Sequence, residues 1–190
     1  RLMERGETFD VVAGASSGSI CGAVWVSGLA ADGPDMFRSL ASTPIVSTRY
    51  LKTERSPFGM GSIVREALRR YVPERAVVES PTELLVSTTR ASRFLRSALE
   101  AASRRVGIGR LSPLDAEPSH EQHYEHPSPV HALATRGGSL VIHSNRTRSD
   151  MHDVIVASCT IPGLYAKLQV LDGEVHVDGG AADNTLLGAL

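Results

Sequence analysis

A serine flanked by two glycines stands near the start of the chain, in the pentapeptide Gly14-Ala-Ser16-Ser-Gly18. The apolar run 9–13 before it predicts a buried strand, and the small residues from 17 to about 29 predict a helix. In this strand-turn-helix setting, a serine is held on a tight turn at the positive end of the helix dipole. The pattern predicts a nucleophile at Ser16; the alternative is a serine that only caps the helix.

A serine hydroxyl needs a base to react, and the last predicted strand, 174–178, offers two candidates. Asp178 ends this strand and is followed by Gly179-Gly180, so its carboxylate is expected at the carboxyl edge of the sheet, where α/β sites collect. From these residues alone, an ordinary Asp-Gly turn is the favoured interpretation. His176 shares a strand face with Asp178, and a surface histidine is the favoured interpretation there.

Three ordered blocks of the chain resemble the patatin-like phospholipase family. They are Glu7-Thr-Phe-Asp-Val-Val-Ala-Gly-Ala-Ser-Ser-Gly-Ser-Ile-Cys-Gly-Ala23, Ala157-Ser-Cys-Thr-Ile-Pro-Gly-Leu-Tyr165 and Asp172-Gly-Glu-Val-His-Val-Asp-Gly-Gly-Ala-Ala-Asp-Asn184. The resemblance implies a three-layer α/β/α sandwich with a mostly parallel central sheet. It also implies a Ser-Asp dyad that cleaves lipid acyl esters through an acyl-enzyme, without a catalytic histidine and without a cofactor.

The resemblance assigns roles by position. Ser16 matches the family nucleophile, with Gly14 and Gly18 forming its turn, and Asp178 matches the general base, with Gly179 and Gly180 completing its motif. The family also has a glycine-rich oxyanion loop before the nucleophile. Only 15 residues precede Ser16 and none forms such a loop, so we expect the oxyanion loop to be absent from this chain, which resembles a catalytic domain that lacks its beginning.

The elements that must position these groups indicate an α/β domain. Strands are predicted over 83–89 and 139–144, with a helix over 94–106 between them, and strands that alternate with helices are typical of layered α/β folds. The proline-rich residues 107–129 predict a surface excursion. We therefore expect one patatin-like hydrolase domain over residues 1–190.

Composition excludes several classes of protein. The chain has 42% apolar and 22% charged residues and a net charge of −1, which is typical of a globular domain and argues against nucleic-acid binding. Two cysteines are too few for a disulfide framework. There is no signal peptide and no apolar stretch of about 20 residues, so a cytoplasmic or peripheral membrane location is expected.

Two local clusters suggest partners. A basic segment has the charge to contact anionic lipid headgroups, although a solvated face is the favoured interpretation. The segment contains Arg90, Arg93, Arg96, Arg104, Arg105 and Arg110. His120, His123 and His126 have the spacing of metal ligands on a helix. A solvated loop helix is favoured for the histidines, and no metal site is expected.

The function that these features favour is a serine acyl hydrolase of lipid esters. One alternative is a Ser-His-Asp esterase whose histidine lies outside this chain, and another is a non-catalytic lipid-binding domain with the same fold. Lipid or another acyl ester is the expected partner, and the sequence leaves the oligomeric state open.

Overall fold

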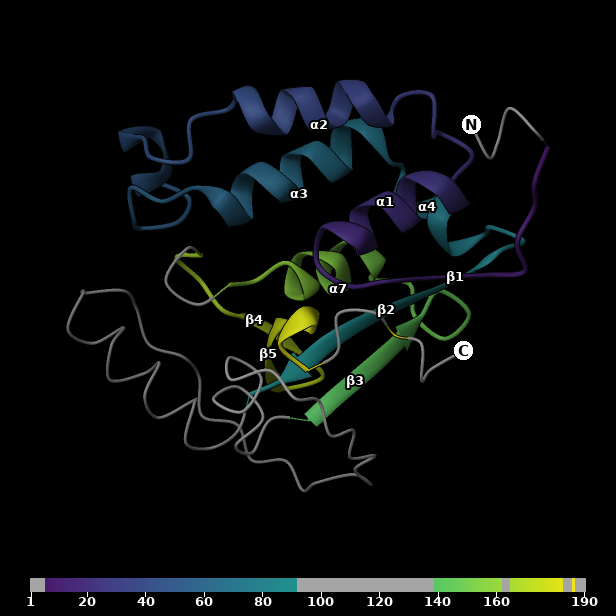
Figure 1. Cartoon of the computed structure of the whole chain (residues 1–190). Helices are drawn as coiled ribbons and strands as arrows, with labels where there is room; N and C mark the ends of the chain where they lie inside the picture. The colour runs from purple at the N-terminus through teal and green to yellow at the C-terminus, as the bar shows by residue number, and fades with distance from the viewer. Residues whose placement is uncertain (1–5, 92–138, 162–164, 183–185, 187–190) are drawn as a thin grey trace.

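The computed structural model describes residues 6–91, 139–161, 165–182 and 186 (Figure 1). Five strands belong to one sheet: β1 (Val11–Gly14), β2 (Glu83–Arg90), β3 (Ser139–Ser144), β4 (Gln169–Leu171) and β5 (Glu174–Asp178). The α-helices are α1 (Ser17–Val26), α2 (Gly33–Ser42), α3 (Met60–Tyr71), α4 (Glu74–Val78) and α7 (Met151–Ser158). Two short 3-10 helices, η2 (Thr48–Leu51) and η3 (Gly179–Ala181), complete the described elements.

The α/β class expected from the sequence is confirmed. The predicted strands correspond to β1, β2, β3 and β5, and the helix predicted after the pentapeptide is α1, which ends three residues earlier than expected. The sequence patterns did not predict β4 and α4, which have three and five residues. The predicted helix 94–106 and the predicted excursion 107–129 lie outside the described residues.

The resemblance implies a mostly parallel sheet, whereas most of the strand pairings in the described sheet are antiparallel. β1 pairs with β2 in parallel, whereas the β2–β3, β2–β5 and β4–β5 pairings are antiparallel. The β4–β5 pairing has a local cause, because Asp172 and Gly173 form a two-residue turn and both have positive φ, 51° and 82°. Such a turn joins antiparallel strands.

β1 and β5 lie end to end along the same edge of β2. β1 pairs with residues 83–86 and β5 with residues 88–90, while β3 occupies the other edge along residues 85–90. Since β1 runs parallel to β2 and β5 runs antiparallel to it, the carboxyl ends of β1 and β5 point toward each other at the level of Ser87. This topology brings the residues after Gly14 close to Asp178.

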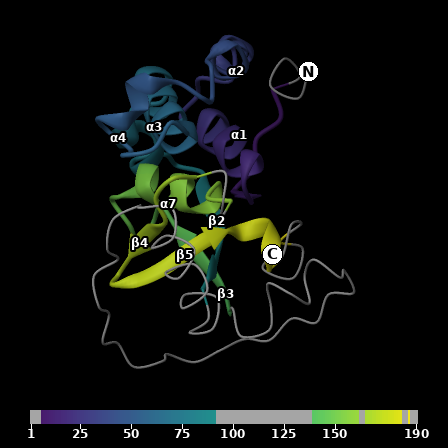
Figure 2. The same cartoon turned by 90° about the vertical axis from the view of Figure 1, so that its left-hand side faces the viewer.

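The described helices lie on one side of the sheet (Figure 2). α1 and α7 pack directly on β2, α3 packs on α7, and α2 packs on α3. The core between these layers is fully buried and apolar; its largest members include Met36, Leu68, Leu84, Met151 and Ile155. Within the described ranges, no helix has the length and apolar character needed to cross a membrane.

Candidate active site

Ser16 occupies a strained turn between β1 and α1. Its backbone has φ 51° and ψ −126°, a region that residues other than glycine rarely adopt. Gly14 permits the turn, because a Cβ at that position would overlap the backbone of Gly18. The Ser16 N–H donates to Ser158 Oγ at 2.9 Å, so α7 holds the turn in place.

The Ser16 hydroxyl does not cap α1. No hydrogen bond joins it to the helix, so the alternative of a capping serine is not supported. The N–H groups of Gly18 and Ser19 donate to the carbonyls of Ala15 and Ser16, at 2.8 and 3.0 Å. Within the described residues, the N–H of Ser17 has no acceptor, and it lies at the positive end of the α1 dipole.

Asp178 is held at the end of β5 by three backbone contacts. Its N–H donates to the Thr160 carbonyl and its carbonyl accepts from Thr89 Oγ1, both at 2.8 Å. Its Oδ1 accepts the Gly180 N–H at 2.8 Å, whereas Oδ2 has no hydrogen-bond partner among the described residues. A side chain at Gly179 would overlap the Ser87 carbonyl, so glycine is required for this close approach to β2.

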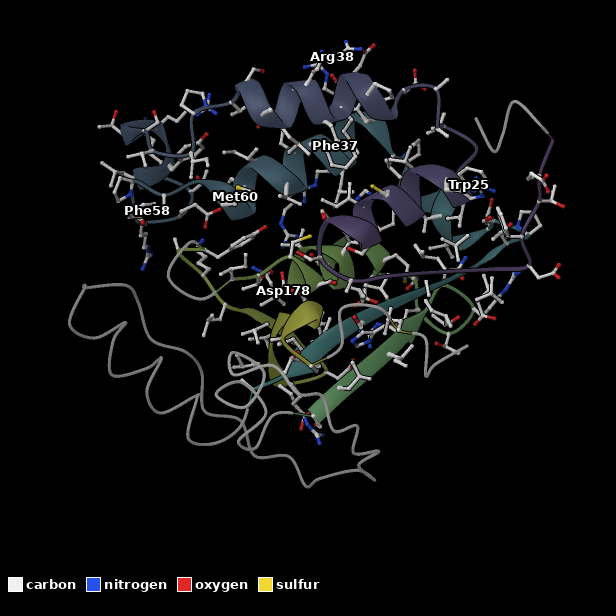
Figure 3. The ribbon with its side chains drawn as sticks, viewed as in Figure 1. Trp25, Phe37, Arg38, Phe58, Met60 and Asp178 are labelled. Atoms are coloured by element: carbon white, nitrogen blue, oxygen red, sulfur yellow. The ribbon has the colours of Figure 1, made fainter. Side chains whose placement is uncertain are left out.

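The end of α7 and the residues just after it contact both Ser16 and Asp178. Ser158 Oγ, on the last residue of α7, accepts from Ser16, and the carbonyl of Thr160, two positions beyond the helix, accepts from Asp178. Figure 3 shows Asp178 beside α7, close to where β1 turns into α1. The fold therefore brings together two groups that lie 162 positions apart in the sequence.

The side chains of Cys159 and Tyr165, near Asp178, are largely shielded from water. Burial and, to a smaller extent, the negative charge of Asp178 together raise the pKa of the Cys159 thiol to about 12. Burial also raises the pKa of Tyr165, again with Cys159 and Asp178 adding to the effect. Both side chains are therefore neutral near pH 7. Ser19 Oγ lies 4.0 Å from Cys159 Sγ, which links α1 to the same region.

His176 is buried, so its favoured interpretation as a surface histidine is wrong. Thr88 Oγ1 forms 2.8 Å hydrogen bonds with His176 Nδ1 and with His143 Nε2. The two imidazole rings meet edge to face with their centroids 5.6 Å apart. β2 thus holds both histidines through one threonine, a pairing between distant strands that strand periodicity could not reveal.

This histidine pair predicts loss of stability in mild acid. Burial lowers the pKa of both imidazoles from 6.5 to about 4; the positive charge of Arg148 adds to the effect at His143, and His143 adds to it at His176. The unfolded state therefore binds more protons between these pH values. The free energy of unfolding keeps the full contribution of the neutral imidazoles above about pH 6.5. It falls as the pH drops towards 4, by on the order of 3 kcal/mol per histidine.

Urea unfolding at about pH 7 and about pH 5 measures this effect. The control is the double variant His143→Gln, His176→Gln, which should be less stable at neutral pH but should lose less stability on acidification. An equal loss in the variant and the unchanged chain would show that other groups cause the acid sensitivity.

His152 is the one further histidine that the structure describes, and it bonds elsewhere. His152, on α7, bonds the Val72 carbonyl at 2.8 Å, whereas His120, His123, His126 and His131 lie outside the described residues. Among the residues that the structure describes, no three histidine, cysteine or acidic side chains are grouped to hold a metal ion.

Sequence reasoning missed the roles of Ser158 and Thr160. The block Ala157–Tyr165 carried a signal for them, because it contributes to the family resemblance although no residue in it was assigned a function. Through its contacts with Ser16 and Asp178, that block positions both residues.

The family model described as patatin-like phospholipase matches residues 1–190. The comparison with curated proteins found no match to this chain.

Proposed function

Because the chain belongs to the patatin-like phospholipase family, whose members are lipid acyl hydrolases, we propose that it cleaves lipid acyl esters with a Ser16-Asp178 dyad. The observation that carries this proposal is the state of the Ser16 hydroxyl. It has no capping bond and belongs to a residue with a strained backbone at the start of α1. β1, which precedes it, and β5, which carries Asp178, end toward each other beside Ser87 of β2.

The proposed reaction begins with proton transfer from Ser16 to Asp178. As Asp178 takes the proton, Ser16 Oγ attacks the acyl carbonyl carbon and forms a tetrahedral intermediate. This intermediate expels the alcohol, which leaves with the proton from Asp178, and an acyl-serine remains. Water then attacks the acyl-serine and gives a proton to Asp178. When Ser16 leaves, it recovers that proton and the fatty acid is released.

The Ser17 N–H is the donor that we propose for the negative charge on the carbonyl oxygen. It follows the nucleophile directly, has no acceptor in the described structure and lies at the α1 dipole end. A backbone N–H in this position is typical of nucleophile turns.

In the proposed mechanism Asp178 acts as the general base, so no histidine is needed. Its Oδ1 is occupied by the Gly180 N–H, and Oδ2 is the oxygen that we propose accepts the Ser16 proton. His176 is less suited to that task, because its Nδ1 bonds Thr88 and burial lowers the pKa of its imidazole to about 4.

Contact with a lipid surface is part of the proposal, since the substrates are lipids. Arg90, the only described member of the basic segment, is turned inward and bonds Glu174 and Ser139. Arg93, Arg96, Arg104, Arg105 and Arg110 lie outside the described residues. A cytoplasmic or peripheral location stays a prediction.

Fatty-acid release tests the proposed activity. The chain should release fatty acid from a diacyl phospholipid or from a neutral acylglycerol, and should release none from an ether-linked phospholipid that has no acyl carbonyl. Heat-denatured protein gives the background rate. Failure to hydrolyse every acyl ester of both classes would contradict the proposal.

A further inference from the structure

The connection between α2 and α3, residues 43–59, exposes an unusual number of large apolar side chains. Four of the nine exposed large apolar residues in the described structure lie in it: Ile45, Val46, Leu51 and Phe58, with 40%, 59%, 50% and 40% of their surface exposed. Several exposed large apolar side chains gathered in one segment typically mark a site of interaction.

The same connection is positively charged. Arg49, Lys52 and Arg55 are exposed, and the only acidic residue, Glu54, is buried. Glu54 accepts a hydrogen bond from Ser62 and lies 3.9 Å from Lys167. The connection therefore carries a net charge of +2, three cations and one carboxylate, whereas the whole chain carries −1.

Hydrogen bonds hold the connection in a defined shape. Val46 and Phe58 form an isolated antiparallel bridge, and the N–H groups of Ser47 and Gly59 donate to the Pro57 and Ile45 carbonyls at 2.9 and 2.8 Å. Tyr50 is buried and its hydroxyl donates to the Pro44 carbonyl at 2.8 Å. The apolar side chains are thus displayed from a closed loop, so little conformational entropy is lost when they become buried.

The connection lies at the end of the molecule toward which β1 runs. Figure 1 shows it beyond the carboxyl end of β1, and Figure 3 shows Phe58 and Met60 at that end, with Asp178 further in. Gly61, in the first turn of α3, lies next to Tyr165, because a Cβ at that position would come within 3.4 Å of the Tyr165 ring. Tyr165 is in turn within electrostatic reach of Asp178. Ligands of α/β sheets enter at the carboxyl ends of strands, and a surface bound here would lie on the side toward which β1, the strand before Ser16, runs.

We propose that the α2–α3 connection docks the protein on an anionic lipid bilayer. Leu51, Phe58, Ile45 and Val46 would enter the interfacial layer while Lys52, Arg49 and Arg55 contact headgroup phosphates. The mixture of exposed apolar side chains with unopposed cations matches an anionic membrane surface better than a neutral one. The inference rests on the proposed function, because it names the surface through which that site reaches its lipid.

Vesicle co-sedimentation tests the proposal without requiring catalysis. All variants carry Ser16→Ala so that the vesicles stay intact, and binding is compared between pure phosphatidylcholine and phosphatidylcholine mixed with phosphatidylglycerol. We expect tighter binding to the mixed vesicles. The pair Lys52→Ala, Arg55→Gln should weaken that binding by about 25-fold, or about fivefold per cation, with little effect on pure phosphatidylcholine.

The apolar pair is a second, independent variant. Leu51→Ser with Phe58→Ser should weaken binding to both kinds of vesicle by at least about tenfold. Ile142→Ser and Arg69→Ala are the matched controls, because they remove an exposed apolar residue on β3 and an exposed cation near the end of α3. Each variant is checked by its thermal unfolding transition.

Three results would overturn the docking surface. One is vesicle binding that neither pair of substitutions weakens, and another is equal weakening by the controls. The third is absence of vesicle binding together with a concentration-dependent dimer that the apolar pair dissociates, which would assign the surface to a second copy of the chain. Turnover of a short water-soluble ester, with Ser16 intact, reports separately on the proposed activity.

Discussion

Ser16→Ala should reduce ester turnover by roughly 10⁴- to 10⁶-fold, because the substitution removes the oxygen that attacks the acyl carbonyl. The protein should stay folded. The Ser16 hydroxyl makes no capping bond, and the two contacts of this residue, with Ser158 and Ser19, involve its backbone. The measurement is the rate of fatty-acid release, with thermal unfolding recorded for each protein.

Ser42→Ala is the matched control for this substitution. Ser42 is exposed at the end of α2 and bonds only the Ser39 carbonyl of its own helix. Its loss should leave turnover unchanged. Turnover that survives in a folded Ser16→Ala protein would exclude Ser16 as the nucleophile.

Asp178→Asn should reduce turnover by roughly 10²- to 10⁴-fold, the usual contribution of a general base. Asparagine is the informative replacement, because its side-chain oxygen can still accept the Gly180 N–H that Asp178 Oδ1 accepts. The backbone contacts with Thr160 and Thr89 also remain. The variant therefore removes the proton acceptor while it preserves the end of β5, and kcat should fall more than KM changes.

Asp172→Asn is the corresponding control on the same hairpin. Asp172 is largely exposed and its carboxylate pairs with Arg148, so its loss should change turnover little. An unchanged rate in Asp178→Asn would contradict the dyad and would require another base. If His176→Gln then abolished turnover in a protein that still folds, the role of base would pass to His176.

The local features of the site follow from short stretches of sequence. The apolar run before Gly14 and the small residues after Ser16 predict a strand, a turn and a helix, and the structure contains β1 and α1 in those places. Likewise, the alternation in 174–178 predicts β5 with Asp178 at its end. Each of these elements depends on residues that are neighbours in the sequence, so the periodicity of apolar side chains predicts it directly.

The juxtaposition of Ser16 and Asp178 depends on contacts between distant segments. It arises because β1 and β5 share one edge of β2, and no local pattern states which strand pairs with which. Burial of His176 depends in the same way on Thr88, 88 positions away. The exposed apolar side chains of the α2–α3 connection could not be predicted either. Residues 49–58 have the composition of an ordinary loop, and only the structure shows that Tyr50 is buried there and bonds the Pro44 carbonyl.

Reaction with a fluorophosphonate, followed by peptide mass spectrometry, tests the central claim most directly. The reagent forms a stable adduct only with an activated hydroxyl, so the predicted result is a single adduct on the peptide that contains Ser16, at Ser16 itself. Labelling should be lost in Ser16→Ala and much slower in Asp178→Asn. An adduct on another serine, or labelling at the same rate in Asp178→Asn, would contradict the proposed dyad.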